Sequence, residues 1–598
     1  MPFKLKEEEI ADILNGDTSD IEEFYEDDIN LDNLDELLMN VNDVYEDIND
    51  VNDVTEIDDI DEIVPANNVE TENVQEIIHE VANGNKTIIT EPNWISEQWK
   101  EPETDWQGKL PDPPDELLSP LQYFKLFIDD DIINNFVQQT NIYSTEKSGK
   151  CIAVSTSEME QFLGINMYMG IVKMPHYRMF WQNNSRYPLI ADNMSRNRFD
   201  NLRYYFHIND NAKMLPRTHA DHDKLFKVRP FITAVKNNMR KINFEEFSSV
   251  DEIIIPFKGR TFMKQYNKNK PHRWGIKMFA IASASGLVHD FEIYTGKGTL
   301  QQAEQGLGIS GDVVLRLVDG IPKNQNYKVA MDNWFNSYHL QCRLKFSGVL
   351  GIGTVRSNRL AKCKMCSDTI MKKQGRGVFD SKVDTVNNIV VTKWYDNKFV
   401  HIISNYKGPY PTDIVKRWSV GVKSKIDVVR PASVLEYNSF MGGIDLHDML
   451  VELYRIDIRV KRFYLRIVYH IIDMCTVNAW LLYRRHCKQM NIKKTLSLLQ
   501  FKTDLTHALL LSGNKTPKRG RPSLNSTISP STKKKRVFSA RPVDDVRYDK
   551  IDHWQIPMDI KQRCKLCIKN YTTTKCNKCN VYLCYTKNRM CFMEFHKK

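Results

Sequence analysis

The stretch Tyr-Lys-Val-Ala-Met-Asp-Asn-Trp-Phe-Asn, residues 327–336, joins a short apolar run to a polar turn. The run Val329–Met331 has the length and character of a buried strand, and it stops at Asp332. Apolar residues at helical spacing follow, so the stretch reads as a strand leading into a helix. In α/β folds, side chains converge at the carboxyl ends of such strands. An Asp here also suits a helix N-cap or a turn, so its role depends on whether other carboxylates join it.

Charge divides the 598-residue chain into two unequal parts. Residues 1–80 contain 28 Asp and Glu against two Lys, and the other 518 residues carry a net charge of +33. A basic body of this kind favours a polyanionic partner, although solubility accounts for some of the charge. The start of the chain has no apolar signal region, and the apolar stretch 467–483 is interrupted by His470 and Asp473. We therefore expect no membrane partner.

Strand-like segments begin after residue 247. Segments 249–255, 274–282 and 288–294 read as three successive antiparallel strands, and Asp251 lies on the first. Later, Gly442-Gly443 precedes a helix in which Asp445 and Asp448 are three residues apart and therefore share a face. Acids in a first helical turn also stabilise the helix dipole, so their position alone does not assign a function.

Two regions outside these strands are predicted to be helical. In 118–246, one helix follows Ser119-Pro120, a second opens with a capping box at Ser157-Glu-Met-Glu160, and a third spans 194–207. Segment 451–486 reads as a long helix in which basic residues alternate with aromatic residues, including Arg462 and Phe463. Such surfaces suit either solvated helix faces or contact with nucleic acid.

The last part of the chain combines a basic linker with a cysteine-rich tail. In the linker, Arg519-Gly-Arg521-Pro522 resembles an AT-hook and Lys533-Lys-Lys-Arg536 resembles a nuclear import patch, although short basic matches also arise by chance. Paired Cys-x2-Cys motifs place two thiolates on one tetrahedral ion, and eight ligands fit two structural zinc sites. The candidate zinc ligands are Cys564, Cys567, Cys576, Cys579, Cys584, Cys591, His596 and, upstream, His553. The isolated pair Cys363 and Cys366 is expected to be free thiols.

The short sequence motifs around each Asp resemble those of the piggyBac transposase family, and they occur in the same order over about residues 118–486. They are Val250-Asp-Glu252, Phe257-Lys-Gly-Arg260, Lys270-Pro-His-Arg-Trp-Gly-Ile-Lys277, Asp332-Asn-Trp-Phe335, Gly353-Thr-Val-Arg-Ser-Asn358 and Gly442-Gly-Ile-Asp-Leu-His-Asp448. Met194-Ser-Arg-Asn-Arg-Phe199 and the cysteine-rich tail also resemble that family.

The resemblance implies a multidomain α/β protein with an RNase H-like catalytic core. Asp251, Asp332 and Asp445 would form a catalytic triad that binds two Mg²⁺ ions, with Asp448 as a supporting acid. The remaining candidate site residues are those expected to contact DNA: Arg260, Arg273, Lys277, Arg356, Arg462, Phe463, Arg519 and Arg521.

Together these features predict eight consecutive segments. They are an acidic disordered region (1–117), a helical dimerisation and DNA-binding domain (118–246), an RNase H-like core (247–356), a β-rich insertion (357–429), the second part of the core (430–456), the second part of the helical domain (457–512), a basic linker (513–552) and a cysteine-rich zinc domain (553–598).

Two positions depart from the family pattern. Phe463 stands where the family usually has Trp, at a position linked to the flipped base or hairpin; Phe still stacks but has less area and no indole donor. Lys587 stands where some members have a His after the fifth Cys, which leaves the ligands of the second zinc ion open. Hairpin processing and zinc pairing are therefore the least determined properties.

The sequence favours a nuclear, homodimeric DNA transposase that cuts double-stranded DNA at terminal inverted repeats and inserts it at TTAA through hairpin intermediates. An alternative is a domesticated nuclear protein that binds specific DNA sequences without transposing. A third interpretation, a scaffold protein with an acidic head, explains the first 115 residues and little else.

Overall fold

The computed structural model describes residues 78–80, 86–88, 91–97, 99–267, 270, 272–296, 299–300, 306–458, 460–512, 547–548 and 553–597. The chain forms two compact units. The first, here called the body, comprises Met1–Tyr177 and Pro188–Gly513, and the second, the C-terminal unit, comprises Arg178–Tyr187 and Asn514–Lys598. The acidic residues 1–77 and the linker motifs at 519–522 and 533–536 lie outside the described residues.

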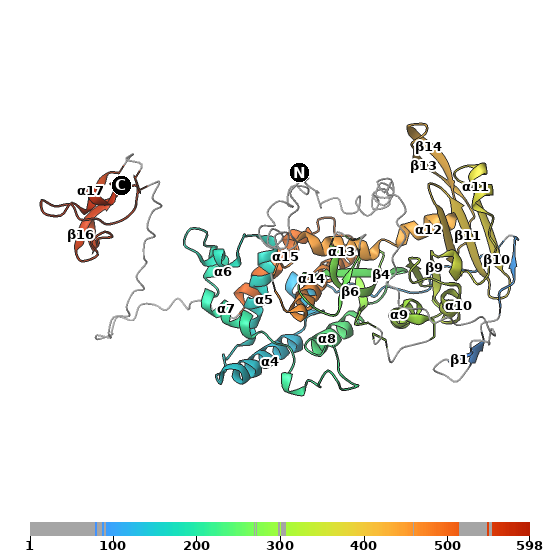
Figure 1. Cartoon of the computed structure of the whole chain (residues 1–598), viewed down its shortest axis with the longest axis horizontal. Helices are drawn as coiled ribbons and strands as arrows, with labels where there is room; N and C mark the ends of the chain where they lie inside the picture. Colours follow the sequence, from blue (N-terminus) through green and yellow to red (C-terminus); the bar gives the residue numbers. More distant parts are fainter. Residues whose placement is uncertain are drawn as a thin grey trace, which may run out of the picture. The chain divides into compact units, whose positions relative to one another are not determined.

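Helices gather at one end of the body (Figure 1). They are α3 (Pro120–Lys125), α4 (Asp130–Ser148), α5 (Thr156–Ile171), α6 (Pro188–Ala191), α7 (Arg196–Tyr205), α8 (Arg229–Met239), α14 (Phe463–Gln489) and α15 (Leu498–Leu511). Helix α3 begins as predicted, because the Ser119 side chain accepts the Gln122 N–H and Gln122 caps Ser119 in return. Helices from the early and the late part of the sequence pack together, since α14 and α15 both contact α3.

The predicted capping box at Ser157–Glu160 was wrong by two residues. Helix α5 is capped by Ser155, whose hydroxyl accepts the Glu158 N–H, while the Glu158 carboxylate accepts the Ser155 N–H. Both pairs have the spacing of a capping box, and the upstream pair forms it because Ser155 has extended backbone (φ −94°, ψ 163°).

A ten-stranded sheet runs through the rest of the body in the order β3-β10-β11-β12-β9-β8-β4-β6-β5, with β7 also paired to β6. Its strands are β3 (Trp94–Ile95), β4 (Phe247–Pro256), β5 (Lys264–Tyr266), β6 (Trp274–Ser283), β7 (Val288–Ile293), β8 (Lys328–Met331), β9 (Leu350–Thr354), β10 (Phe379–Asp384), β11 (Ile389–Tyr395) and β12 (Phe399–Ser404). Smaller two-stranded pairs are β1 (Ile78–Glu80) with β2 (Lys86–Ile88) and β13 (Asp413–Ser419) with β14 (Ser424–Arg430).

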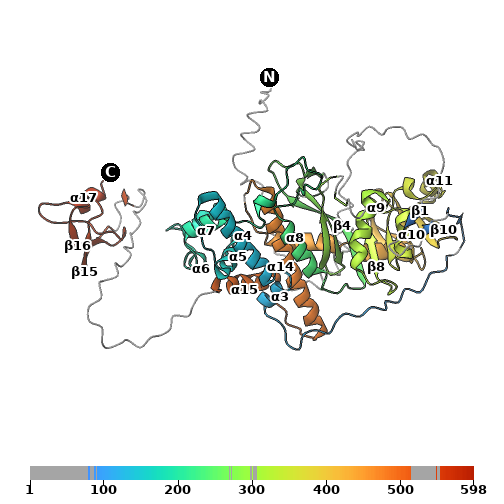
Figure 2. The ribbon, with the colours of Figure 1, turned by 90° about the horizontal axis from the view of Figure 1, so that it is seen from below.

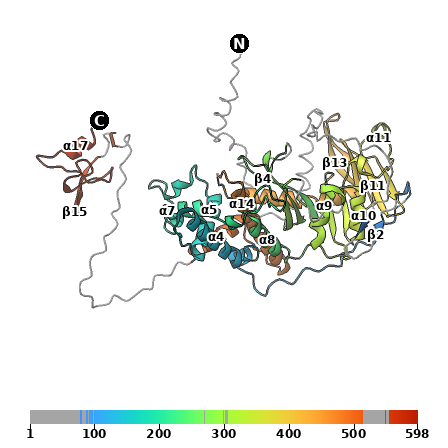
Figure 3. The same ribbon diagram turned by 60° about the horizontal axis from the view of Figure 1, so that its bottom comes forward.

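The centre of this sheet combines both strand directions. Strands β4, β6 and β7 form the predicted antiparallel meander, whereas β8 is parallel to both β4 and β9. Helices α9 (Gly308–Leu317) and α10 (Tyr338–Phe346) lie side by side against it (Figures 2 and 3). Val250, Val329 and Met331 are fully buried in the core between them. Residues 327–336 therefore contain the buried strand β8 and the turn that leads into α10.

Residues 357–429 continue the central sheet. Besides α11 (Asp368–Gln374), they contain β10 to β14, and β12 is hydrogen-bonded antiparallel to β9, so that Ile402 pairs with Thr354. Strands β13 and β14 form a separate hairpin (Figure 1). The segment is rich in strands, and three of them extend the same sheet that holds β4 and β8.

The expectation of disorder was wrong for residues 91–97 and 99–117. Strand β3 pairs with β10, the Trp99 indole N–H donates to Asn388 Oδ1 over 2.5 Å, and the Gly408 N–H donates to Glu101 Oε1 over 3.0 Å. Trp106 packs edge-on against Tyr327, the residue before β8. Trp99 and Trp106 are half-buried, and their contacts help to hold this polar, proline-rich segment on the body.

The long helix predicted for 451–486 is interrupted. Helices α12 (Ala432–Phe440) and α13 (Gly443–Leu453) precede a non-helical segment, and α14 begins only at Phe463. The Ile456 N–H donates to Asp473 Oδ2 on α14, which satisfies part of the interrupted backbone. By length and composition α14 is able to span a membrane, but its apolar window is 100% buried inside the protein.

Candidate functional site

Asp251 and Asp332 lie at adjacent positions on neighbouring parallel strands. Val250 on β4 is in register with Met331, the last residue of β8, and each Asp follows directly. Adjacent strands are about 4.8 Å apart, so the topology places the two side chains side by side. Both are partly buried.

Asp332 also shapes the turn after β8. Its Oδ1 accepts the N–H groups of Trp334 over 2.9 Å and Phe335 over 3.4 Å. Burial raises the pKa of the Asp332 carboxyl, and these hydrogen bonds oppose the rise. The turn-capping role considered for this residue is therefore real, and both of these hydrogen bonds use Oδ1.

Helix α13 brings the other two acids to the same part of the sheet. It packs on β4 and β6, and a Cβ at Gly443 would lie 2.5 Å from the Ser283 carbonyl oxygen. Only glycine permits this close approach of helix and strand. Asp445 and Asp448 follow within the next two turns, so a glycine at the helix start sets their distance from β4.

Electrostatic coupling links the four acids. Burial raises the pKa of Asp251 to about 8, and the like charges of Asp445 and Asp332 add to this effect, against the opposing charge of Lys270. Burial likewise raises the pKa of Asp448 to about 6, with Asp445 contributing. The charges of Asp332 on the turn after β8 and of Asp445 on α13 thus both act on Asp251 on β4.

The four carboxylates are not drawn together into a tight ligand group. Among the residues that the structure describes, the two groups of three or more Cys, His, Asp or Glu ligand atoms within 4.8 Å of one another are both in the C-terminal unit. Asp445 Oδ1 instead lies 3.0 Å from Nζ of Lys270, which comes from the loop between β5 and β6. A lysine therefore occupies the space beside one of the acids.

Two residues near the acids were not predicted as site residues. Lys270 begins the motif 270–277, which resembles the family, but the sequence analysis assigned it no role. Burial raises the pKa of Tyr437 on α12, a hydrogen bond with Thr354 opposes the rise, and the charges of Asp332, Asp251 and Asp445 add to it, so Tyr437 lies within electrostatic reach of all three predicted triad members. No pattern in the sequence marks Tyr437, because only the packing of α12 places it there.

The predicted DNA-contact residues fall into separate groups. Nζ of Lys277 lies 2.5 Å from Oε2 of Glu252. The same ammonium group lies over the ring of Trp334, in the turn that follows Asp332. Arg356 donates from Nε to Asn333 Oδ1 over 3.3 Å, which also places it at this turn. The structure therefore brings both cations to the edge of the acidic cluster.

The other predicted contacts lie elsewhere. Arg260 and Arg273 are exposed on the segments before β5 and β6. At the start of α14, Arg462 donates to the Tyr204 carbonyl oxygen of α7 over 3.3 Å, and the next residue is Phe463. Arg519 and Arg521 lie outside the described residues.

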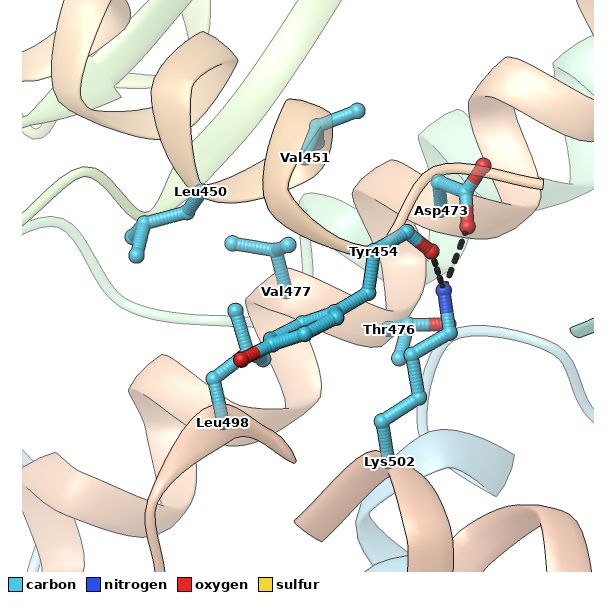
Figure 4. A pocket seen from close by; sticks show the side chains of 8 residues that line it. All are labelled: Leu450, Val451, Tyr454, Asp473, Thr476, Val477, Leu498 and Lys502. Atoms are coloured by element: carbon cyan, nitrogen blue, oxygen red, sulfur yellow. Dashed lines mark hydrogen bonds and ion pairs between the residues drawn. The ribbon is translucent and has the colours of Figure 1, made fainter. Parts of the chain in front are cut away.

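A small pocket lies beneath the far end of α13. Its lining, drawn in Figure 4, is Leu450, Val451, Tyr454, Asp473, Thr476, Val477, Leu498 and Lys502. Lys502 Nζ donates to Asp473 Oδ1 over 2.9 Å and to the Tyr454 carbonyl oxygen over 2.5 Å, and both charged side chains are at most 4% exposed. This buried ion pair therefore fixes the chain immediately after the acid-bearing helix.

The C-terminal unit contains two groups of four candidate metal ligands. The unit is built from β15 (Gln555–Arg563), which pairs with β16 (Tyr571–Cys576), and α17 (Cys591–Phe595). One group is Cys564, Cys567, Cys584 and Cys591, and the other is His553, Cys576, Cys579 and His596. All eight residues predicted as zinc ligands are present, and the two groups alternate along the chain.

The donor chemistry of these groups fits a thiophilic ion. In each group the ligand atoms lie within 4.8 Å of one another, and Sγ of Cys567 is 3.9 Å from Sγ of Cys584. A tetrahedral zinc ion with bonds of about 2.3 Å holds its sulfurs roughly 3.8 Å apart. Burial and the neighbouring thiols Cys564 and Cys567 raise the pKa of Cys584 to about 12 and of Cys591 to about 11, a cost that a divalent ion relieves.

Comparison with known proteins supports one family throughout. The Transposase IS4 family model matches residues 119–480. Human piggyBac transposable element-derived protein 3 is 30% identical over 83% of this chain and 81% of its own length. Human piggyBac transposable element-derived protein 2 is 31% identical over 75% of this chain and 72% of its own length.

The fold is also similar to that of a solved structure. A cryo-EM structure of a piggyBac transposase synaptic complex with hairpin DNA aligns with a TM-score of 0.56 and 21% identity, covering 80% of this chain and 99% of that one. The family model spans more than half of the chain, and it includes Asp251, Asp332, Asp445 and Asp448. The protein therefore belongs to the piggyBac transposase family.

Proposed function

We propose that this protein is a metal-dependent DNA transposase, which excises a DNA element through hairpin intermediates and inserts it at TTAA. The observation that carries the proposal is the convergence of Asp251, Asp332 and Asp445 from two strands and a helix: Asp251 and Asp332 follow paired positions on β4 and β8, and the charges of Asp332 and Asp445 both act on Asp251. Carboxylates gathered in one partly buried place are costly to ionise unless cations or a reaction require them.

The strand order supports an RNase H-like core. Strands β7, β6, β4, β8 and β9 are neighbours in that order, with the first three antiparallel and the last two parallel to β4. In this arrangement one acid lies on the central strand and a second lies at the end of its parallel neighbour. The third comes from a helix that is much later in the chain and packs against β4.

Asp251, Asp332 and Asp445 would hold two Mg²⁺ ions, and Asp448 would support them. Carboxylate oxygens are the ligands that Mg²⁺ prefers, and such ions activate the attacking oxygen and stabilise the leaving oxygen of a phosphodiester. The residues of the chain keep the ligands in place: the turn N–H groups hold Asp332, and Gly443 lets α13 approach the sheet.

Double-stranded DNA is the proposed substrate and partner. Lys277 and Arg356 at the edge of the acids are placed to contact phosphates, as are the exposed Arg260 and Arg273. Arg462 and Phe463 offer a cation and a stacking ring at the start of α14, and Arg519 and Arg521 are proposed to reach a minor groove. The two Cys and His groups are proposed to bind two structural Zn²⁺ ions in a domain that recognises terminal repeats.

The proposal extends to a homodimer that acts in the nucleus. The basic patch Lys533-Lys-Lys-Arg536 supports nuclear import, and two protomers would pair the two ends of an element.

Strand cleavage tests the proposal directly. Purified protein is incubated with Mg²⁺ and DNA that carries both genomic flanks of the coding sequence, and nicks and hairpins are counted. Asp332→Asn keeps the size of the side chain but removes a charge that the metal ions require, so cleavage should fall about a thousandfold or more. Asp319→Asn, an exposed Asp after α9, is the control and should cleave like the wild type. Unchanged cleavage by Asp332→Asn would reject this function.

The relatives themselves favour one alternative. Two of them are named as human proteins derived from a transposable element, so a DNA-binding protein without transposition is a second candidate. Wild-type protein that binds the flanking DNA in Mg²⁺ without nicking it would favour this alternative.

A further inference from the structure

Lys270 lies beside Asp445, one of the four acids. Its Nζ lies 3.0 Å from Asp445 Oδ1, across the gap between the β5–β6 loop and α13. Its side chain is 19% exposed and that of Asp445 is 37% exposed. A long, flexible side chain held this far from water requires a compensating partner, which Asp445 provides.

The charge of Lys270 acts on more than one acid. It lowers the pKa of Asp251 and of Asp448, against the effect of burial on each. In return, Asp445, Asp251 and Asp448 together raise the pKa of Lys270 despite its burial. One ammonium group therefore offsets part of the repulsion among three of the carboxylates.

Other nearby cations have different carboxylate partners. Lys277 pairs with Glu252 over 2.5 Å, and Arg455 pairs with Glu452 over 2.6 Å. Neither partner belongs to the proposed metal ligands. Lys270 differs because its partner, Asp445, is itself a proposed ligand.

An ammonium and a divalent ion compete for the same oxygen. If both contacted Asp445 Oδ1, they would lie within a few ångströms of each other, and their repulsion would be strong in a partly buried site. The acids already fall short of a 4.8 Å ligand group among the described residues, while Asp445 is held toward Lys270. Ion binding therefore requires Asp445 to leave its lysine.

We propose that Lys270 is a built-in counter-cation of the metal-free site, which binds Asp445 until divalent ions displace it. This inference rests on the proposed function, because it takes Asp251, Asp332 and Asp445 as the metal ligands. Lys270 is thus a positioning residue that sets how tightly the ions bind and stabilises the protein in their absence.

The affinity for Mn²⁺ measures this competition without DNA. Full-length protein with its Cys and His groups saturated with Zn²⁺ is titrated with Mn²⁺, which is followed by electron paramagnetic resonance. Lys270→Met removes the competing charge and should bind Mn²⁺ about tenfold more tightly, whereas Lys270→Arg should resemble the wild type. In EDTA the melting temperature of Lys270→Met should fall, and Mn²⁺ should restore more of it than in the wild type.

Two further variants control the experiment. Lys264→Met removes a lysine from the same hairpin, where Nζ lies 4.9 Å from the centre of the Trp274 ring, and it should leave Mn²⁺ affinity unchanged. Lys270→Gln keeps a hydrogen-bond donor for Asp445 and is the variant to use if Met prevents folding. Because the charge is what competes, Gln should show the same gain in affinity.

The outcomes separate this inference from the proposed function. Unchanged or weaker Mn²⁺ binding by Lys270→Met and Lys270→Gln, in a protein whose Mn²⁺ affinity is lost in Asp445→Asn, overturns the counter-cation alone. Mn²⁺ binding that is absent from the wild type, or indifferent to Asp445→Asn, overturns the metal site and the inference together.

Discussion

The two candidate metal sites differ in how their ligands are held before an ion binds. In the C-terminal unit, eight Cys and His residues within the 44 residues from His553 to His596 already form two groups with ligand atoms less than 4.8 Å apart. In the body, the acids Asp251 to Asp448 span 198 residues, and they interact through their charges without forming such a group. The first site is built by local spacing and the second by topology.

This difference follows from the chemistry of the ligands. Thiols and neutral imidazoles carry no charge, so they pack together at little cost, and the cysteines also form much of the core of the small C-terminal unit. Carboxylates in one place repel each other, and the body needs a sheet, a helix, a lysine and a buried ion pair to keep them close. The C-terminal unit should therefore need its ions to fold, whereas the body should fold without ions and need them for activity.

Removal of zinc should have the largest effect. The C-terminal unit has a small core made mostly of its own ligands, so Cys564→Ser or a strong chelator should unfold residues 553–597. Structural zinc contributes about 10 kcal/mol or more to folding in domains of this kind. Hydrogen exchange followed by mass spectrometry should show loss of protection there and none in the body.

Cys363→Ser is the control, since Cys363 lies in the body outside both ligand groups. Metal analysis should find two zinc ions per wild-type chain. A zinc-free chain that keeps the wild-type protection in 553–597 would break the contrast between the two units.

The buried pair beneath α13 should have the next largest effect, and it concerns the body alone. Lys502→Met leaves the Asp473 carboxylate buried without its cation and frees the Tyr454 carbonyl oxygen, so the body should lose about 3–5 kcal/mol of stability. Lys494→Met, at an exposed lysine in the loop before α15, should change little. Calorimetry of the body transition measures both, and the transition of the C-terminal unit should not move.

The contrast between the sites also explains what the sequence could predict. The candidate metal ligands of the C-terminal unit could be predicted from residue types and from the Cys-x2-Cys spacing. Their division into two groups could not, because the groups alternate along the chain. The four acids were identified by the sequence motifs around them, which resemble those of the family. Spacing alone left Asp332 as a turn residue, and the turn hydrogen bonds are indeed present.

What sequence reasoning missed depended on packing between distant segments. Lys270 lies in a polar loop, a place where a lysine is normally solvated, and only α13 makes it a partner of Asp445. The helix break before Phe463 was missed because apolar and basic residues continue through it at helical spacing. Trp99 and Trp106 were assigned to a disordered region on composition, although their burial against β-strands and core holds that segment in place.

Acid should weaken the body through a buried histidine, and this is the smallest of the three effects. His289 accepts from the Ser283 hydroxyl at Nε2 over 2.7 Å, donates from Nδ1 to the Ile242 carbonyl oxygen over 3.2 Å, and stacks on Phe244. Burial lowers the pKa of His289 to about 3, from an ordinary value near 6.5. His289 therefore becomes protonated below pH 6.5 in the unfolded chain, but only near pH 3 in the folded body.

The sign of the effect follows from this difference. The stabilisation from neutral His289 is complete above pH 6.5 and is lost progressively as the pH falls toward 3. At pH 5 the body should have lost roughly 2 kcal/mol of stability. His289→Gln should remove about one proton from the pH dependence of body unfolding between pH 6.5 and 5, whereas the exposed His219→Gln should not. The C-terminal unit should lose stability over the same range only while it holds zinc, because protons then compete with the ion for Cys and His. Equal acid sensitivity of the zinc-free and zinc-bound C-terminal unit would show that its ligands do not hold the metal that distinguishes it from the body.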